Sequence, residues 1–320
     1  MTDHPEFGFR DPRYEEFPPV VQVALVSGIC PSHCAYCPVG DRTLPMKELV
    51  FDPDMFRRLA DEVATHPWAI LRVHGRGEPM CHPQYVSMIA YAKQCGVGVV
   101  TSFTNGIYLT RHVESLLDAG IDLLEVSADA ADAARYSAWR RNQYFKDVVE
   151  GVRQLYDVRN RRPGSRTRIV VSAVDHPEFR PHRAAFEDFW APFCDKVLVR
   201  PFHTYGGLIP DPYERSRQVE DYIPCVQLWE RFSVNSAGMV NACFNDWMDD
   251  DIVGDLRDPG ATIADIWRSQ AFREARRGSL AGPCLRCCAK CSGSSLSSWG
   301  AGGYQYWVHS LLGTALPSGV

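Results

Sequence analysis

The chain has 320 residues, of which 45% are hydrophobic and 23% charged, and its formal net charge is −5. A chain of this length can bury one large core, or a core of about 200 to 250 residues with a smaller appendage. The slight negative charge argues against nucleic-acid binding, which usually shows as a basic stripe, and no run approaches the roughly 18 apolar residues of a membrane span. We therefore expect a packed cytoplasmic protein whose partners are small molecules or proteins.

Short apolar runs alternate with helical patterns from residue 20 to residue 201. The expected strands are 21–27, 69–74, 97–104, 123–127, 168–173 and 196–201, and the expected helices are 53–65, 84–94, 110–119, 145–159 and 180–192. This alternation is typical of βα units around a parallel sheet. Six units are too few for a complete eightfold barrel, so we predict an open, partial (β/α)6 TIM barrel with its active site at the carboxyl ends of the strands.

The pattern changes after residue 201, where a turn-rich segment at 204–212 begins a second unit. Residues 232–242 predict a hairpin that turns at Ala237 and Gly238, and residues 263–277 predict a helix. We expect an N-terminal extension at 1–19, the partial barrel at 20–205 and a small α+β unit at 206–320. The last thirty residues, rich in Gly, Ser, Trp and Tyr, give no clear pattern.

Twelve cysteines are unexpected in a reducing compartment, and nine of them fall into two groups. In the first group, Cys30, Cys34 and Cys37 form Cys-x3-Cys-x2-Cys directly after the first expected strand. Three thiolates can each bind one iron of a [4Fe–4S] cluster, which normally takes four cysteines. The missing ligand would leave one iron open to substrate, as in catalytic metal sites. A zinc knuckle and buried cysteines are the alternatives.

With Tyr36 before its third cysteine, this motif resembles the Cys-x3-Cys-x-aromatic-Cys motif of the radical S-adenosylmethionine (radical SAM) superfamily. Four further segments resemble the superfamily in the same order along the chain. They are 74–79 (His-Gly-Arg-Gly-Glu-Pro), 104–106 (Thr-Asn-Gly), 125–130 (Glu-Val-Ser-Ala-Asp-Ala) and 136–140 (Tyr-Ser-Ala-Trp-Arg). Each match is weak alone, but five in order, most of them at strand ends, are specific together.

The resemblance implies a site for S-adenosylmethionine at these segments. The residues carried over are Tyr36, Gly75, Gly77, Glu78, Asn105, Ser127, Asp129 and Arg140. Glu78 would meet the methionyl amino group, and Ser127 and Asp129 would lie near the ribose. Arg140, with Arg141 as its competitor, would meet the methionyl carboxylate. One glycine is displaced relative to the Gly-Gly-Glu-Pro segment of the superfamily.

The chemistry of the superfamily is also implied by this resemblance. The open iron binds S-adenosylmethionine, and an electron from the reduced cluster cleaves it to a 5′-deoxyadenosyl radical that removes a hydrogen atom from substrate. A flavodoxin- or ferredoxin-type protein would supply the electron. Protein groups would then contribute mainly positioning and exclusion of water.

The second group lies in the last third of the chain and consists of Cys225, Cys243, Cys284, Cys287, Cys288 and Cys291. A hairpin can hold two thiolates, and either Cys-x2-Cys pair, 284/287 or 288/291, can complete four ligands for a closed cluster or for zinc. The segment resembles the SPASM and twitch extensions of radical SAM enzymes. This resemblance favours the twitch form with one auxiliary [4Fe–4S] cluster, and it leaves the choice of pair open.

A closed auxiliary cluster can accept the electron that remains when a substrate radical loses a proton. We therefore expect dehydrogenation of a secondary alcohol in a sugar, aminocyclitol or nucleoside-type molecule of natural-product biosynthesis, because twitch-bearing relatives act on such substrates. Arg200 is expected to bind or polarise the substrate hydroxyl, with a structural ion pair as the alternative. His203 or Glu125 is expected to accept the proton.

Other reactions remain open. Cys81, just past the Gly-Glu-Pro turn, can donate a hydrogen atom if it faces the radical, which would make the protein an epimerase; otherwise it is a buried cysteine. A radical dehydratase or decarboxylase acting on a sugar, a peptide-modifying SPASM enzyme and a non-catalytic zinc-binding scaffold are the further alternatives.

Overall fold

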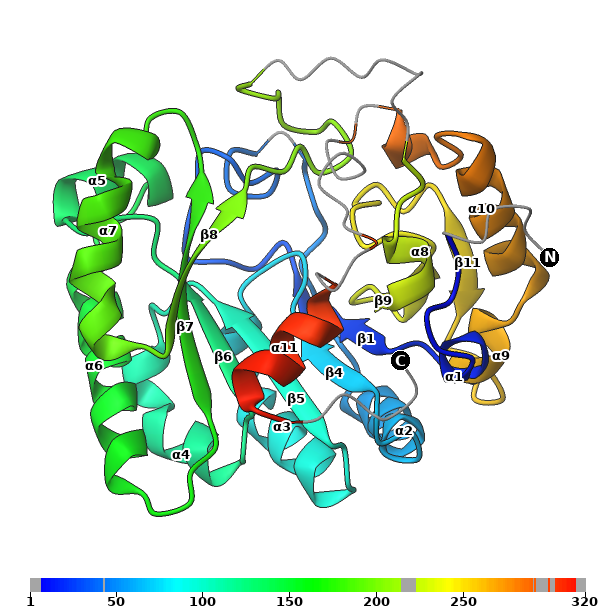
Figure 1. Ribbon diagram of the computed structural model, residues 1–320, viewed down its shortest axis with the longest axis horizontal. Coiled ribbons are helices and arrows are strands. Elements are labelled where there is room, and N and C mark those ends of the chain that lie inside the picture. The colour runs from blue at the N-terminus through cyan, green and yellow to red at the C-terminus, as the bar shows by residue number, and fades with distance from the viewer. Residues whose placement is uncertain are drawn as a thin grey trace.

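Six parallel strands form the centre of the computed structural model, which describes residues 7–42, 44–213, 223–289, 291, 299 and 303–314. The strands are β1 (Val20–Val23), β4 (Ile70–Val73), β5 (Val99–Thr104), β6 (Leu123–Ser127), β7 (Arg168–Asp175) and β8 (Lys196–Pro201). Each pairs in parallel with the next, and among the described residues β8 is the last strand of the sheet. The expected partial barrel is therefore confirmed (Figure 1).

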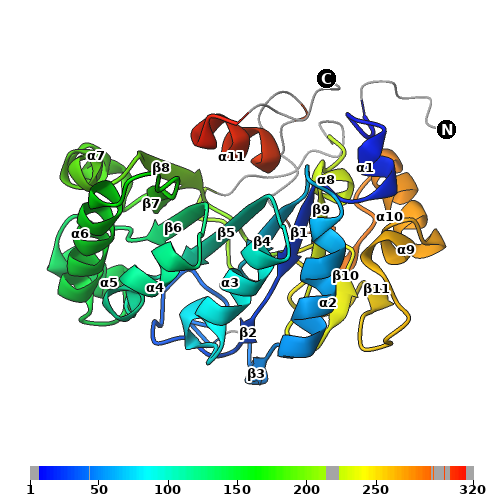
Figure 2. The ribbon, with the colours of Figure 1, turned by 90° about the horizontal axis from the view of Figure 1, so that it is seen from below.

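Helices cover the convex face of this sheet (Figure 2). They are α2 (Pro53–Ala64), α3 (Tyr85–Gln94), α4 (Val113–Asp118), α5 (Ala133–Arg140), α6 (Phe145–Arg161) and α7 (Arg183–Trp190). In α2, Asp52 caps the amino end by accepting a hydrogen bond from the Met55 amide, and Phe56, Leu59 and Val63 face the core. A cap of this kind contributes about 1 kcal/mol. The sequence predicted all of these helices except α5.

The concave face of the sheet is covered by α11 (Tyr304–Leu312), which the sequence did not predict. Its Val308 packs on Ile70, Val99, Leu123 and Val170, which lie near the amino ends of four strands. Figures 1 and 2 show α11 on the side of the sheet opposite to α2 and α3. The helix therefore fills the amino end of the barrel interior and leaves the carboxyl ends of the strands to the functional site.

Three further strands extend the sheet beyond β1. They are β9 (Arg231–Val234), which pairs in parallel with β1, and β10 (Met239–Asn241) and β11 (Ile252–Asp255), which continue it antiparallel. The hairpin between β9 and β10 turns at Gly238, whose φ of +82° is a conformation that glycine adopts without strain. The predicted hairpin is thus confirmed, and it brings the second unit into the same sheet as the barrel.

Two predicted elements differ from the structure. The expected strand 21–27 is divided, because the chain leaves the main sheet after β1 and β2 (Val26–Ser27) pairs with β3 (Leu49–Val50) instead. The single helix expected at 263–277 is two helices, α9 (Ile263–Trp267) and α10 (Gln270–Ala281). Ser269 separates them because its hydroxyl caps α10 by accepting from the Phe272 amide. The short helices α1 (Arg13–Glu16) and α8 (Gln227–Glu230) complete the main elements.

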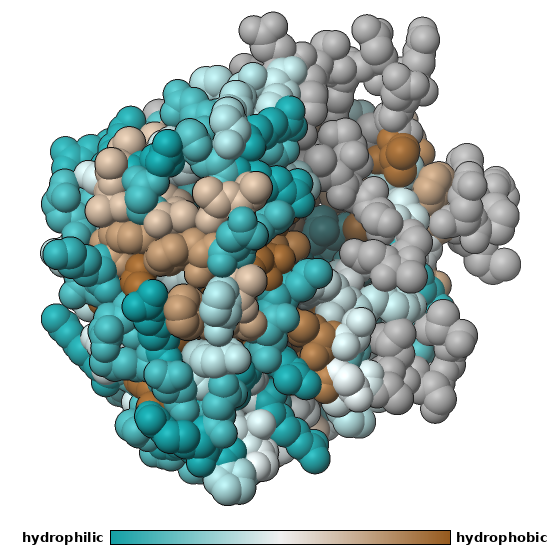
Figure 3. Space-filling view, turned by 60° about the vertical axis from the view of Figure 1, so that its left-hand side comes forward, coloured by the Kyte–Doolittle hydropathy of each residue, from teal (hydrophilic) through white to brown (hydrophobic). Residues whose placement is uncertain are grey.

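The face of the molecule turned forward in Figure 3 is mostly hydrophilic, with apolar groups gathered in a band across its upper left part. Within the described residues, no helix combines the length and apolar composition needed to cross a bilayer.

Candidate functional site

One cavity of about 780 Å³ opens at the carboxyl ends of the parallel strands, and Cys30, Cys34 and Cys37 all line it. The loop that carries them is fixed to the end of α5, since the amides of His33 and Ala35 donate to the carbonyls of Arg140 and Trp139. Burial raises the pKa of Cys37 to about 11 and also raises the pKa values of Cys30 and Cys34. The thiols therefore stay neutral unless a metal displaces their protons.

Gly75 and Gly77 also line the cavity, and close packing explains why neither carries a side chain. A Cβ at Gly75 would lie 2.2 Å from the Cβ of Ala24, and one at Gly77 would lie 2.6 Å from the carbonyl oxygen of Ile29. The segment that follows β4 therefore lies directly against the start of the cysteine loop. A larger residue at either position would force these two segments apart.

Glu78 joins this segment to the end of β5. Its carboxylate accepts hydrogen bonds from the Thr104 hydroxyl and the Asn105 amide, both at 2.7 Å, and from the Met80 amide at 3.1 Å. Burial raises its pKa, while these hydrogen bonds lower it. The side-chain amide of Asn105 lies 3.6 Å from the Cys30 thiol. Glu78 and Asn105 thus come together beside the first cysteine, as the sequence predicts for one cofactor site.

Tyr36, Asp129 and Arg140 form a largely buried network next to Cys34. The carboxylate of Asp129 accepts a hydrogen bond from the Tyr36 hydroxyl and forms an ion pair with Arg140. Arg140 also donates to the Cys34 thiol at 3.5 Å, and its Nε is buried with no partner among the described residues. Arg141, the competing candidate, is exposed at the left-handed end of α5 and does not line the cavity. Ser127 does line it.

The second cysteine group faces the same cavity. Cys225, Cys243, Cys287, Cys288 and Cys291 line it, whereas Cys284 is exposed outside it. The thiols nevertheless form a connected chain, with hydrogen bonds from Cys284 to Cys288, from Cys287 to Cys288 and from Cys287 to Cys243. Hydrogen bonds from Cys284 and Cys287 lower the pKa of Cys288. The structure thus brings the pair 284/287 to Cys243, together with Cys288 from the other pair.

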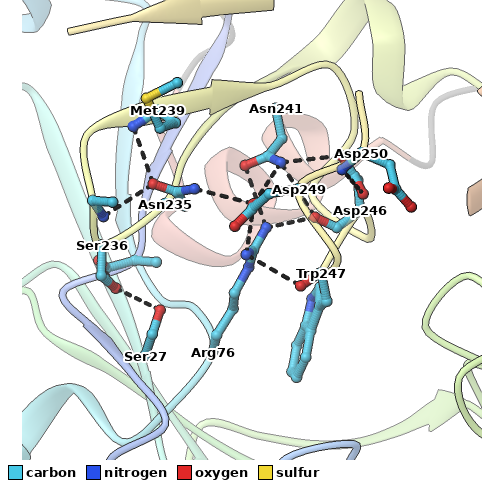
Figure 4. Close-up of polar contacts among 12 residues, drawn as sticks. Ser27, Arg76, Asn235, Ser236, Met239, Asn241, Asp246, Trp247, Asp249 and Asp250 are labelled. Carbon is cyan, nitrogen blue, oxygen red and sulfur yellow. Dashed lines mark hydrogen bonds and ion pairs between the residues drawn. The ribbon is translucent and has the colours of Figure 1, made fainter. Parts of the chain in front are cut away.

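Arg76, between the two cavity glycines, extends toward Asn241, Asp246 and Asp249 (Figure 4). Its guanidinium forms an ion pair with Asp249 at 2.7 Å and donates to the Asp246 carbonyl at 2.5 Å and to the Asn241 side chain at 3.3 Å. Asp249 also accepts from the side chains of Asn235 and Asn241. These residues surround the loop that carries Cys243, so one buried arginine holds that loop against the segment containing Gly75 and Gly77.

The predicted catalytic residues occupy different positions. Arg200 lines the cavity with 31% of its side chain exposed, and it makes a two-pronged ion pair with Glu125, which is fully buried beneath it. His203 lines the cavity near the second cysteine group, 3.0 Å from the Asn245 amide and 3.9 Å from the Cys291 thiol. Cys81 is not among the residues that line the cavity. The ion pair expected as the alternative for Arg200 is thus present, whereas Glu125 and Cys81 do not line the cavity, and the role of Arg200 toward a substrate hydroxyl stays a prediction.

Matches to protein families agree with this geometry. Residues 25–174 match the Radical SAM superfamily, and residues 225–292 match SPASM, described as an iron–sulfur cluster-binding domain. The chain carries a radical SAM domain followed by a SPASM domain. The sequence favours the shorter twitch form of the second domain. The SPASM match does not test this choice, so the twitch form stays a prediction.

Curated relatives match the radical SAM domain over a limited length. A GTP 3′,8-cyclase of Chlorobaculum tepidum is 29% identical over 136 residues, which cover 42% of this chain and 40% of the relative. Another from Rhizobium leguminosarum bv. trifolii is 32% identical over 131 residues, which cover 40% of this chain and 37% of the relative. The chain thus spans about 40% of the length of these relatives.

Solved structures resemble the chain over most of its length. BtrN in complex with AdoMet and 2-DOIA has a TM-score of 0.59 and 18% identity, covering 88% of this chain and 95% of that one. SuiB of Streptococcus suis bound to the precursor peptide SuiA has a TM-score of 0.64 and 11% identity, covering 82% and 67%. Native anSMEcpe with bound AdoMet has a TM-score of 0.58 and 12% identity, covering 92% and 95%. At these identities the likeness concerns the fold.

The two domains imply one [4Fe–4S] cluster that binds S-adenosylmethionine and one auxiliary [4Fe–4S] cluster, and the residues present fit both. Cys30, Cys34 and Cys37 provide three thiols in one cavity, next to the Nε of Arg140, a buried donor that can serve a carboxylate. Cys243 and its thiol neighbours provide a second, separate set. The ligand sets and cofactor contacts themselves remain predictions.

Several residues that line the cavity were not predicted from the sequence. They are Arg72, His74, Phe103, Arg231, Phe244, Tyr304 and Trp307. A signal was present in β4 and the residue after it, where the polar Arg72 and His74 alternate with the apolar Leu71 and Val73. Alternation with period two places the polar pair on the concave face. Tyr304 and Trp307 carried no such signal, because they belong to the unpredicted α11.

Proposed function

We propose that this radical SAM enzyme dehydrogenates a secondary alcohol of a sugar, aminocyclitol or nucleoside-type small molecule. The observation that carries the proposal is that both cysteine groups line one cavity. Substrate in that cavity would face the radical-generating site and the auxiliary site together. The volume of about 780 Å³ is within the range of small-molecule pockets.

The chain's own residues would bind and orient the reactants. Cys30, Cys34 and Cys37 would hold the first cluster, with Glu78 and Arg140 beside the amino and carboxylate groups of S-adenosylmethionine. When bound, the first cluster and S-adenosylmethionine together would supply a 5′-deoxyadenosyl radical, and the auxiliary cluster would supply an electron acceptor. Arg200, oriented by Glu125, would hold a substrate hydroxyl, and His203 would accept the proton because its ring reaches the cavity. A flavodoxin- or ferredoxin-type protein would provide the electron.

Supporting evidence for a small substrate also comes from the comparisons. BtrN was crystallised with AdoMet and 2-DOIA, and the matched cyclases are named for GTP. 2-DOIA and GTP therefore belong in a substrate panel, together with aminocyclitols, glycosides and nucleosides. Twelve free cysteines fit a reducing compartment, in line with the expected cytoplasmic location.

Two measurements on protein prepared anaerobically, without added iron or sulfide for the metal analysis, test the proposal. Iron and acid-labile sulfide are expected for two clusters per chain, whereas zinc without sulfide would leave only the scaffold alternative. Formation of 5′-deoxyadenosine across the panel identifies the substrate, and a substrate deuterated at the carbinol carbon then reports the reaction. Product that has lost two hydrogens supports dehydrogenation, whereas product that takes up solvent hydrogen without that loss would show epimerisation.

A further inference from the structure

The wall of the cavity formed by β4, β8 and β9 carries three arginines, namely Arg72, Arg200 and Arg231. Glu125 neutralises Arg200 through two hydrogen bonds. The other two differ, because neither guanidinium hydrogen-bonds or pairs with any residue that the structure describes, and the Nε of each is a buried donor without a partner. Both side chains are only 6% exposed. Buried cations without a counter-charge are costly, so a missing partner is expected here.

Aromatic rings hold both guanidinium groups in place. Arg72 lies 4.3 Å from the ring centre of Tyr304 and 5.4 Å from that of Phe103, and Arg231 lies 4.5 Å from Phe244 and 5.5 Å from Tyr304. Tyr304 is itself fixed by a hydrogen bond of 2.9 Å to Thr101. Contact with an aromatic face immobilises a guanidinium and leaves its edge N–H groups free to donate. The two arginines are thus preorganised donors rather than mobile side chains.

The local charge balance is positive. Burial lowers the pKa of Arg231 to about 9, and repulsion by Arg72 is the next cause. Burial also lowers the pKa of Arg72, to which Arg200 adds repulsion. The carboxylate that acts on Arg231 is Glu230, which forms no ion pair with it within the described part of the chain. Three cations on this wall therefore share two carboxylates, Glu125 and Glu230.

We propose that Arg72 and Arg231 form an anion-binding subsite for a phosphate or carboxylate group of the substrate. This inference rests on the proposed function, because it defines the substrate of that same cavity. Arg231 also has Cys243 as a neighbour, so a cluster held there would be a second negative group for it. No cysteine acts on Arg72 in the same way among the described residues. A change at Arg72 should therefore affect substrate binding without acting directly on the auxiliary cluster.

Small anions test the subsite without knowledge of the whole substrate. Thermal unfolding and titration calorimetry of the anaerobically reconstituted enzyme would be measured with sodium phosphate, sodium acetate and, at equal ionic strength, sodium chloride. We expect phosphate or acetate, but not chloride, to stabilise the enzyme by mass action. Binding by phosphate alone indicates a phosphoryl substrate, and binding by acetate alone indicates a carboxylate. Stabilisation by neither anion, or equally by chloride, would overturn the proposal.

Three variants make the test specific. Arg72→Gln should weaken the binding of the effective anion at least about tenfold, since charge-assisted hydrogen bonds are lost. Arg72→Lys keeps the charge but loses the planar fork, so its anion affinity should lie between those of the parent enzyme and Arg72→Gln. Arg257→Gln, at an exposed arginine, should bind like the parent enzyme. Unchanged anion binding in Arg72→Gln contradicts the assignment, and a cooperative unfolding transition of that variant without anion would show that it still folds.

The same enzyme preparations separate this inference from the proposed function. Uncoupled or substrate-dependent 5′-deoxyadenosine formation reports the radical SAM chemistry, and anion binding reports the subsite. If neutral sugars are oxidised and anions do not bind, the proposed function stands and the subsite is wrong. If anions bind through Arg72 but fully iron-loaded enzyme never cleaves S-adenosylmethionine, the proposed function is wrong and the subsite stands.

Discussion

Arg76→Met tests how the two cysteine sites are held together. The change keeps most of the length of the side chain but removes the ion pair to Asp249 and the hydrogen bonds to Asp246 and Asn241. A buried polar group that loses its partner costs about 1–3 kcal/mol. The ion pair contributes about 1 kcal/mol or less, because Asp249 is 40% exposed. Relief from burying the guanidinium offsets part of the loss, so we expect about 1–3 kcal/mol of destabilisation.

Thermal unfolding and iron analysis of the reconstituted variant measure this effect. We expect the unfolding temperature to fall by several degrees, and iron to be lost first from the auxiliary site, since the loop around Asp246 carries Cys243. Arg257→Met is the matched control, because its pair with Asp255 is exposed. The reasoning is refuted if Arg76→Met unfolds at the temperature of the parent and retains both clusters, or if Arg257→Met is equally damaging.

Three other changes test the site. Gly75→Ala places a Cβ 2.2 Å from that of Ala24 and should lower the unfolding temperature and the affinity for S-adenosylmethionine, whereas Gly8→Ala, with nothing within 4 Å of the new Cβ, should leave both unchanged. Glu125→Gln leaves Arg200 without its counter-charge, and we expect kcat/KM to fall at least about tenfold while 5′-deoxyadenosine formation without substrate persists. Cys81→Ala should turn over within about twofold of the parent, because Cys81 does not line the cavity, and loss of turnover would show that the thiol takes part.

The barrel could be predicted because its strands are short apolar runs bounded by turns and helices. The bounds of β6 and β8 agree with those expected at 123–127 and 196–201. The first strand was mispredicted at its end, since local pattern does not show that Val26 and Ser27 pair with β3 instead of continuing the main sheet. The prediction of one helix at 263–277 was also wrong, because the Ser269 hydroxyl caps the start of a second helix inside a continuous helical pattern.

The cofactor end of the cavity was more predictable than the substrate end. Motif residues such as Glu78 and Asn105 follow neighbouring strands of the parallel sheet, so their meeting follows from its topology. Arg72 and Tyr304 are far apart in sequence, and their contact exists only because α11 enters the barrel interior. No local pattern predicts that entry, since Tyr304 faces Arg72 through tertiary packing alone.

The displaced glycine in the segment 74–79 can now be explained physically. Gly75 and Gly77 each lie too close to the chain around Ala24 and Ile29 to carry a Cβ, so both glycines are needed for packing. Arg76 lies between them and extends toward Asp246 and Asp249 (Figure 4). An arginine at this position therefore leaves the packing of the two glycines against the cysteine loop unchanged. It also connects this segment to the loop that carries Cys243, so we expect a change at one cysteine site to alter the other.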